Sequence, residues 1–191
     1  MTEIIKKHFE EHMDVVAKLN DDFFQKIEAI SDIISSALRS NQSLFWCGNG
    51  GSCSDSLHLS AELIGRFDKN RIPLKSISLS SDVASITCIA NDFGYDQIFS
   101  RQLEGLATKN DVLVVISTSG ESENTIKAAQ MAKNKGVFCI GFLGKNGGRL
   151  VDLCDHYLIV PSTSTARIQE IHIVAGHIIC DLIESKLKLK D

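Results

Sequence analysis

The sequence predicts an α/β fold: a five-stranded, mostly parallel sheet with helices on both faces, preceded by two N-terminal helices. The first observation is a helical periodicity of apolar residues over residues 3–39. The second is that, from residue 43 onward, five short apolar runs alternate with amphipathic stretches. This alternation is typical of a parallel sheet whose strands are buried on both faces. The 191 residues are enough for a single domain with a full hydrophobic core, spanning residues 1–191.

Two helices are predicted before the sheet. Apolar residues recur at helical spacing from Ile4 to Leu19 and again from Phe23 to Leu38. The polar run at residues 20–22 is the expected break, and its acidic residues favour the start of a second helix. We therefore expect residues 1–40 to form a helical pair and residues 41–191 to form the α/β core.

The apolar runs are the predicted strands, at residues 44–47, 74–79, 112–116, 137–142 and 157–160. Candidate helices lie near residues 53–66, 82–89, 95–107, 122–135 and 147–152, and a long closing helix fits residues 166–187. In an open parallel sheet, ligands bind outside the carboxyl ends of the strands, where the strand order reverses. The segments that directly follow a strand are therefore the expected position of a ligand site.

Composition and charge argue against several classes of protein. The net charge is −4 and no basic block stands out, so a nucleic-acid partner is not indicated. No apolar run reaches the ~18 residues of a membrane span, and the N-terminus does not resemble a signal peptide, so a cytoplasmic location is expected. None of the six cysteines forms a C-x-x-C pair, which favours reduced, buried thiols over disulfides or a zinc knuckle.

The first unusual segment is glycine-rich and directly follows the first predicted strand, with the sequence CGNGGSCSD at residues 47–55. Glycines let the backbone approach a ligand closely, and the N-terminus of the following helix offers free N–H groups and a positive dipole end. This chemistry suits a phosphate or a sugar hydroxyl. A plain tight turn with Ser52 or Ser54 as a helix cap explains the segment about equally well.

The second segment is rich in hydroxyl residues and follows the strand at 112–116, with the sequence STSGESEN at residues 117–124. Hydroxyl and N–H groups beside a helix N-terminus can bind phosphate without a lysine or arginine. Helix capping is the alternative, but four hydroxyl residues within six positions exceed what one cap needs, so binding is favoured. Glu121 in this loop is expected to point to solvent.

The third segment, residues 90–95, has the sequence ANDFGY. Asn91 and Asp92 could hold sugar hydroxyls through paired donor and acceptor groups. Turn formation before the next helix is an equally ordinary use of these residue types, and composition alone favours the turn.

Polar side chains on two predicted helices form a candidate reactive centre. His58 and Glu62 are four residues apart and project from one face of a largely apolar helix, where polar groups need partners or a purpose. His177 lies in an apolar stretch of the closing helix; alone it would be an ordinary core histidine, but beside the other two it could complete a metal site. Gln169 is separated from His177 by a rise of ~12 Å and an offset of ~80° on an ideal helix. For both to bind one ion, the helix must be irregular or another subunit must contribute.

Together these motifs resemble the sugar isomerase (SIS) domain family, and within it the phosphoheptose isomerases, over nearly the whole chain. The matching segments occur in the family's order, at residues 47–52, 55–67, 90–95, 117–120 and 166–172. The resemblance implies the flavodoxin-like SIS fold. It also implies an aldose–ketose isomerase that converts sedoheptulose 7-phosphate to D-glycero-D-manno-heptose 7-phosphate through an enediol, for bacterial lipopolysaccharide or capsule.

The resemblance further implies roles for individual residues. The sugar-contacting residues would be Asn49, Gly50, Gly51, Asn91 and Asp92. The phosphate-binding hydroxyls would be Ser52, Ser117, Thr118, Ser119 and Ser122. The ligands of one Zn²⁺ per subunit would be His58, Glu62, Gln169 and His177, with Gln169 also contacting substrate. Members of the family form homotetramers with active sites at subunit interfaces, and the N-terminal helical pair is expected to serve that assembly.

In the catalytic hypothesis, Glu62 is the base that moves the proton between the two carbons. His177 is the partner acid or base that serves the two oxygens. Glu62 as a base is ranked above Glu62 as a permanent metal ligand, because coordination lowers its basicity. Two alternatives remain open. One is a non-catalytic SIS protein that associates with the bacterial replication initiator, a branch in which the equivalents of Glu62 and His177 tend to be lost. The other is an isomerase or sensor of a different sugar phosphate.

Overall fold

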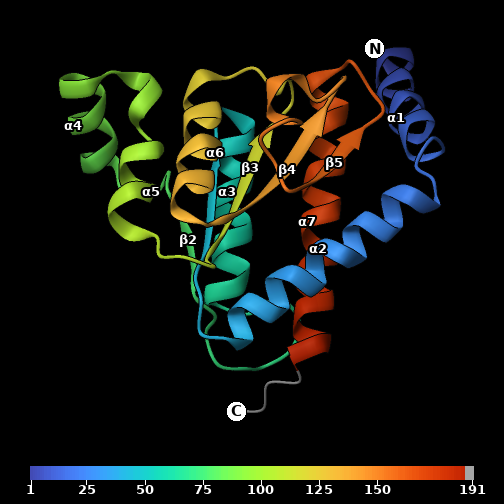
Figure 1. Ribbon diagram of the computed structural model, residues 1–191. Coiled ribbons are helices and arrows are strands. Elements are labelled where there is room, and N and C mark those ends of the chain that lie inside the picture. The colour runs from blue at the N-terminus through green and yellow to red at the C-terminus, as the bar shows by residue number, and fades with distance from the viewer. Residues whose placement is uncertain (188–191) are drawn as a thin grey trace.

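The computed structural model describes residues 1–187 and confirms the predicted α/β architecture (Figure 1). The sheet has five parallel strands in the order β2-β1-β3-β4-β5. The strands are β1 (Leu44–Gly48), β2 (Ser76–Ser78), β3 (Val112–Ser117), β4 (Phe138–Gly144) and β5 (His156–Val160). β1 lies between β2 and β3, so the chain order reverses beside β1, which is where a ligand site is expected. Residues 188–191 of the predicted domain lie outside the described residues.

One face of the sheet is covered by the second N-terminal helix and by the two helices that carry the candidate reactive residues, and the first N-terminal helix packs on the last of these. These are α1 (Thr2–Val16), α2 (Asp21–Arg39), α3 (Gly51–Ile64) and α7 (Thr165–Leu187). Alternate strand residues such as Trp46 and Val114 join these helices in one hydrophobic core. The predicted break between the first two helices is confirmed, because Asn20 caps α2 by accepting a hydrogen bond from the Phe23 N–H at 3.1 Å.

The other face is covered mainly by α5 (Ser100–Leu106) and α6 (Glu123–Lys135), with α4 (Val83–Phe93) beyond them (Figure 1). The strand residues that alternate with the first set, such as Phe45 and Leu113, pack here. Two short 3₁₀ turns complete the chain, η1 (Tyr95–Gln97) and η2 (Gly148–Leu150). A side chain's position along a strand therefore decides which of the two cores it joins.

Three helix boundaries differ from the prediction. The helix expected at 82–89 continues to Phe93, where Gly94 with φ +98° ends it, so the expected turn at 91–92 is helical. The helix expected at 95–107 is divided into η1 and α5, and this interruption accompanies the burial of the adjacent residues Ile98 and Phe99. The helix expected at 147–152 is only the single turn η2.

All six cysteines are free thiols, as predicted. Cys47, Cys139 and Cys180 are buried, and Cys53 and Cys154 are half-buried. The prediction of burial is wrong for Cys88, which is exposed because α4 has no buried residue at all. Among the described residues, no helix is both long and apolar enough to cross a membrane.

Candidate functional site

The loops that follow β1 and β3 meet at the carboxyl ends of these strands. The side-chain amide of Asn49 donates to Asn124 Oδ1 at 2.8 Å, and the amide of Asn124 donates to Asn49 Oδ1 at 2.9 Å. The Tyr95 hydroxyl donates to the same Asn49 oxygen at 2.9 Å. Asn124 is almost fully buried, so this network holds the side chain of Asn49 in one orientation. Tyr95 and Asn124 were not predicted as site residues, although both lie in the unusual segments 90–95 and 117–124.

The glycine-rich loop brings α3 directly against the strand ends. A Cβ atom on Gly48 would lie 2.6 Å from the carbonyl oxygen of Ser52 and 2.9 Å from that of Ile116, so only glycine fits there. Gly50, with φ +57°, is the N-cap residue of α3, and no side chain caps this helix. The alternative in which Ser52 or Ser54 caps the helix is therefore wrong. Ser52 is instead buried in the first turn, beside the free N–H groups of α3.

The hydroxyl-rich loop after β3 is folded by its own side chains. The Ser117 hydroxyl accepts a hydrogen bond from the Gly120 N–H at 3.1 Å, and the Ser119 hydroxyl accepts one from the Glu121 N–H at 3.2 Å. Ser122 is the N-cap residue of α6, but its side chain accepts no capping bond. Thr118 is half-buried in the same loop. The loop thus presents neutral donors at a helix N-terminus, which suits an anion.

The loop after β4 packs tightly against this hydroxyl-rich loop. A Cβ atom on Gly120 would lie 1.9 Å from the carbonyl oxygen of Gly147. Arg149 Nε donates to Glu121 Oε2 at 2.8 Å, and hydrogen bonding to Arg149 lowers the pKa of the Glu121 carboxyl. Glu121 is exposed, as expected, and this ion pair holds its charge beside a cation.

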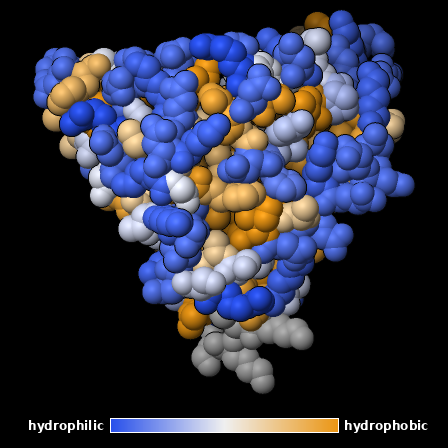
Figure 2. All heavy atoms as spheres, viewed as in Figure 1, coloured by the Kyte–Doolittle hydropathy of each residue, from blue (hydrophilic) through white to orange (hydrophobic). Residues whose placement is uncertain are grey.

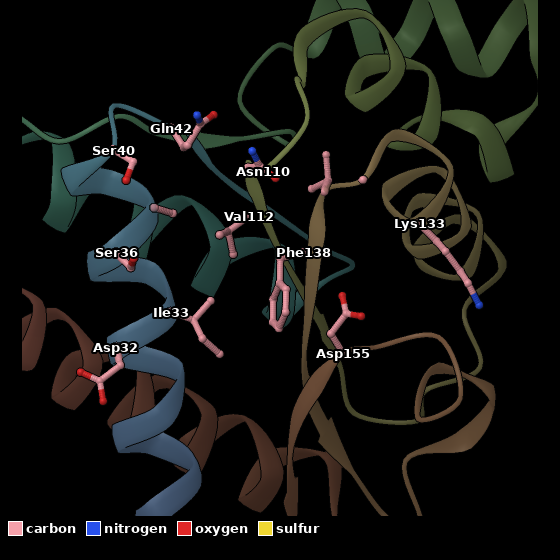
Figure 3. Close-up of a pocket in the computed structure, with 13 residues that line it drawn as sticks. Asp32, Ile33, Ser36, Ser40, Gln42, Asn110, Val112, Lys133, Phe138 and Asp155 are labelled. Atoms are coloured by element: carbon pink, nitrogen blue, oxygen red, sulfur yellow. The ribbon is translucent and has the colours of Figure 1, made fainter.

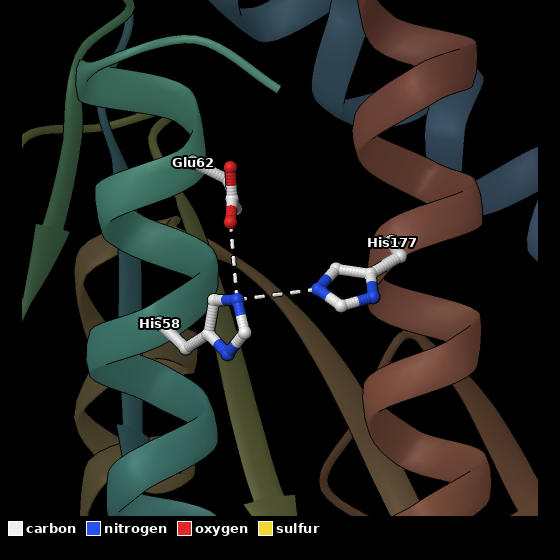
Figure 4. Close-up of side chains that lie close together, drawn as sticks. All are labelled: His58, Glu62 and His177. Atoms are coloured by element: carbon white, nitrogen blue, oxygen red, sulfur yellow. Dashed lines mark hydrogen bonds and ion pairs between the residues drawn. The ribbon is translucent and has the colours of Figure 1, made fainter. Parts of the chain in front are cut away.

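The candidate reactive side chains converge in space. Figure 4 shows Glu62 and His177 directed toward His58, in the gap between α3 and α7. Glu62 Oε1 lies 3.0 Å from His58 Nε2, which lies 3.3 Å from His177 Nε2. The side chains of His58 and Glu62 are 48% and 25% exposed, so the cluster is open at the surface of one chain. The ring of Phe67 covers His177, with centroids 5.4 Å apart.

These three residues offer a donor set that suits Zn²⁺. Two imidazole nitrogens and one carboxylate oxygen lie within 4.8 Å of one another. Three protein ligands of these types are what a catalytic zinc site uses, with a further position left for substrate or water. The residues present therefore fit the group that the sequence predicts.

Gln169 lies at the other end of α3. A Cβ atom on Gly51 would lie 2.5 Å from Gln169 Nε2, so the carboxamide rests on the first turn of α3. His58 is seven residues farther along α3, a rise of roughly 10 Å. The structure thus brings together three of the four predicted zinc ligands and puts Gln169 next to the glycine-rich loop.

Asn91 and Asp92 lie apart from the loops that follow β1 and β3. Both are exposed in the last turn of α4, and the amide of Asn91 donates to Asp92 Oδ1 at 2.7 Å. The next segment makes the contact instead, because the Tyr95 hydroxyl reaches Asn49.

Asp55 lies on α3 between the glycine-rich loop and the reactive cluster, three residues before His58. Its Oδ2 atom is buried and has no hydrogen-bond partner in the described part of the chain. Burial raises the pKa of Asp55 to about 6, and His58 opposes this rise. Asp55 was not predicted as a site residue, since one more acid in a helix carries no signal of its own.

A cavity lies at the opposite edge of the sheet. Figure 2 shows apolar residues gathered near the centre of the face between α6 and α2. The cavity of about 790 Å³ is lined by the amino ends of β3 and β4 and by α2, with Phe138 and Ile33 in its floor (Figure 3). Because it lies at the amino ends of the strands, it is not formed by the loops where the motif residues lie.

Comparisons with known proteins point in one direction. The SIS domain family model matches residues 7–144. The chain is 49% identical to a phosphoheptose isomerase of a Nitratiruptor species, covering 96% of this chain and 98% of that protein. It is 44% identical to one of Helicobacter pylori, covering 95% and 94%. The structure of a phosphoheptose isomerase from Neisseria gonorrhoeae superposes with a TM-score of 0.92 at 34% identity, covering 96% of this chain and 98% of that one.

Proposed function

This chain belongs to the SIS domain family, and from that premise we propose that it is an aldose–ketose isomerase. The proposed reaction interconverts sedoheptulose 7-phosphate and D-glycero-D-manno-heptose 7-phosphate in bacterial heptose biosynthesis. The phosphoheptose isomerases to which it is similar, at 40–49% identity over at least 95% of this chain, support this choice of substrate.

One observation carries the proposal: a carboxylate and an imidazole from two distant segments of the chain meet on the helix that begins at the glycine-rich loop. Glu62 and His177 are more than a hundred residues apart in sequence, yet their polar atoms lie within 4.8 Å of each other. An enediol mechanism needs both kinds of group, one at the carbons and one at the oxygens.

The proton transfers follow from this pair. From ketose to aldose, the Glu62 carboxylate takes a proton from C1 while His177 gives a proton to the carbonyl oxygen on C2, which forms the enediol. Glu62 then returns its proton to C2, and the hydroxyl on C1 gives its proton to His177 as the new carbonyl forms. Each atom is conserved, and both residues end as they began. A positioned acid or base of this kind contributes on the order of 10²–10⁴-fold to the rate.

His58, Glu62 and His177 would hold a Zn²⁺ ion, with Gln169 as the further predicted ligand. When bound there, the ion would polarise the substrate carbonyl and offset the charge of the enediolate. Glu62 Oε1 lies 3.0 Å from His58 Nε2, so the other carboxylate oxygen of Glu62 would be left to face the substrate carbon. This agrees with the ranking of Glu62 as a base above Glu62 as a permanent ligand.

Substrate binding is assigned to the two loops at the ends of β1 and β3. The phosphate would be bound by the hydroxyl and N–H groups of Ser52 and of the segment 117–122, at the N-termini of α3 and α6. The sugar hydroxyls would contact Asn49 and the neighbouring glycines, with Gln169 beside them. Binding energy from the phosphate would orient the reacting end of the sugar toward Glu62. Asn91 and Asp92 retain their predicted sugar contact only if a partner subunit or a movement of α4 brings the sugar to them.

The assembly is proposed to be a homotetramer with active sites between subunits. The reactive cluster is open on one chain, and the same two helices expose the apolar side chains of Leu57, Ile64, Val174 and Ile178. The N-terminal helix α1 exposes a further apolar set, namely Ile4, Ile5, Phe9 and Met13. A second copy covering these surfaces would exclude water from the cluster. Light scattering after gel filtration should then give about four times the chain mass of 21.0 kDa.

The test is product analysis by NMR. Purified protein is incubated with sedoheptulose 7-phosphate, with and without a chelator, and the heptose 7-phosphate anomeric signals are followed. We expect the aldose to form with the untreated protein and to form much more slowly after chelation. Fructose 6-phosphate serves as the matched substrate control. If neither ketose is converted by metal-loaded tetramer, the protein is not the proposed isomerase.

A further inference from the structure

Arg71 and Glu184 form an ion pair that is unlike the others in the described part of the chain. Arg71 Nε donates to Glu184 Oε1 at 2.8 Å, and both side chains are only 1% exposed. The other ion pairs there have at least one partner that is about a third exposed or more. A buried pair of this kind is weak evidence for stability, because desolvation offsets much of the attraction. What its atoms contact is therefore more informative.

The arginine end of this pair holds the last turn of α3. Arg71 Nη2 donates to the carbonyl oxygen of Glu62 at 2.9 Å, and Nη1 donates to that of Leu63 at 2.8 Å. The final carbonyl groups of a helix have no partner within the helix, so an outside donor fixes where the turn lies. Arg71 thus fixes the backbone of the residue whose side chain is the proposed base.

The glutamate end holds the segment that follows α3 against α7. The Glu184 carboxylate accepts hydrogen bonds from the N–H groups of Phe67, Asp68 and Lys69, at 2.9, 3.1 and 2.8 Å. Phe67 is the residue whose ring covers the imidazole of His177, at an interplanar angle of 33°. Glu184 is itself seven residues after His177 on α7. The same carboxylate therefore fixes the Phe67 backbone relative to the helix that carries His177.

We propose that Arg71 and Glu184 are positioning residues of the isomerase, which set the geometry between Glu62 and His177 without touching the substrate. Their ion pair joins the end of α3 to α7 about two helical turns beyond His177. A shift of about 1 Å in such groups can cost about 10²-fold in rate. This inference rests on the proposed roles of Glu62 and His177.

The kinetic test compares a charge-removing variant with a matched control. Glu184→Gln keeps the side-chain size but offers an amide to backbone N–H groups that need an acceptor. We expect kcat to fall at least 10-fold while KM stays within about 2-fold, because the phosphate loops are remote from the change. The control is Asp32→Asn, which removes an ion pair between α2 and α7 that does not reach α3, and its kcat should be unchanged.

A double variant separates positioning from folding. Replacing both members of a buried pair by apolar residues leaves no unpaired buried charge, so Arg71→Met with Glu184→Leu should still fold, with a Tm lowered by the loss of partners for backbone groups. We expect this double variant to keep a low kcat, since the Glu62 carbonyl and the Phe67 N–H both lose their partners. Wild-type kcat in a well-folded double variant would overturn the proposal.

A spectroscopic readout makes the test independent of turnover. The Phe67 ring shifts the NMR signal of the His177 ring proton, and Phe67→Leu defines the signal without that ring. In Glu184→Gln we expect the His177 signal to move toward the Phe67→Leu position. An unmoved signal would refute the positioning role. If the wild type proves inactive while the signal moves as expected, the proposed function fails and the structural role of the pair stands.

Discussion

The two ends of α3 differ in almost every physical respect. Its first turn, with Ser52, is buried against strand ends and offers neutral donors to an anion. Its later turns carry His58 and Glu62, which are charged or chargeable and open to solvent on one side. The first end is shaped by backbone contacts that only glycine permits, whereas the second depends on side chains from a helix more than a hundred residues away.

The difference shows how one helix can serve both binding and chemistry. The loops of the proposed anion end meet within one chain, because the adjacent parallel strands β1 and β3 bring them together. The reactive end is aligned by contacts between α3 and α7, and beside the Phe67 ring over His177 it is open to solvent in one chain. Changes at the first end should therefore act on KM, and changes at the second on kcat.

The largest effect is expected at the reactive end. Glu62→Gln removes the proposed base while keeping its size, so kcat should fall by about 10² or more, with KM nearly unchanged. Steady-state kinetics on metal-loaded protein would measure both constants. A kcat near the wild-type value would remove Glu62 from the mechanism. A rise in KM as large as the expected fall in kcat would contradict the division of α3 into a binding end and a reactive end.

A smaller effect is expected at the anion end. Asn124→Ala removes both hydrogen bonds between the Asn49 and Asn124 carboxamides, so KM for the sugar phosphate should rise about 10-fold while kcat changes little. Asn134→Ala, an exposed change on the same helix, is the matched control and should leave both constants unaltered. A pure loss of kcat in Asn124→Ala would contradict the assignment of this end to binding.

Asp55 lies between the two ends of α3, and its buried carboxyl should make the stability of the fold depend on pH. Its pKa is about 6 in the folded chain against 3.8 ordinarily, so the folded state binds the extra proton and stability decreases as pH rises from about 4 to about 6. In chelated protein, Asp55→Asn should abolish this decrease and gain on the order of 1 kcal/mol at pH 7, after allowance for solvent screening. Urea unfolding at several pH values measures the free energy of unfolding of both proteins. If this free energy depends on pH in the same way in wild type and Asp55→Asn, the raised pKa of Asp55 is refuted.

The smallest effect is expected from Tyr95→Phe. This change removes one hydrogen bond to Asn49 from a side chain that is 60% exposed, so KM should rise only about 2- to 3-fold. A full kinetic comparison at one pH is enough to detect it. A loss larger than that of Asn124→Ala would mean that the hydroxyl touches substrate directly.

The sequence predicted the sheet and its covering helices because strand and helix periods are local properties. Val114 and Trp46 belong to strands in which every residue is buried, and such short apolar runs are visible in the sequence itself. The residue types raised His58, Glu62 and His177 as a possible metal site, and the family resemblance implied their meeting, since nothing local links α3 to α7. The end of α4 was missed because Asn91 and Asp92 favour turns, while Gly94 two residues later sets the boundary.

Other parts of the site had no local signal. Arg71 and Glu184 are ordinary charged residues in sequence, and only the folded chain shows that both are 1% exposed and bonded to backbone groups. Gln169 was expected among the zinc ligands, and its contact with Gly51 depends on how α7 crosses α3. Pairwise placement of helices is a tertiary property, which is why these partners could not be read from spacing.

The distribution of thiols has a practical consequence. Cys88 is the exposed cysteine on α4, while the other five are buried or half-buried. A maleimide dye at limiting concentration should therefore attach mainly to one position, one helical turn from Asp92. The native chain thus carries its own attachment point for a fluorescent reporter, close to the segment that leads to Tyr95, with no cysteine to be engineered in.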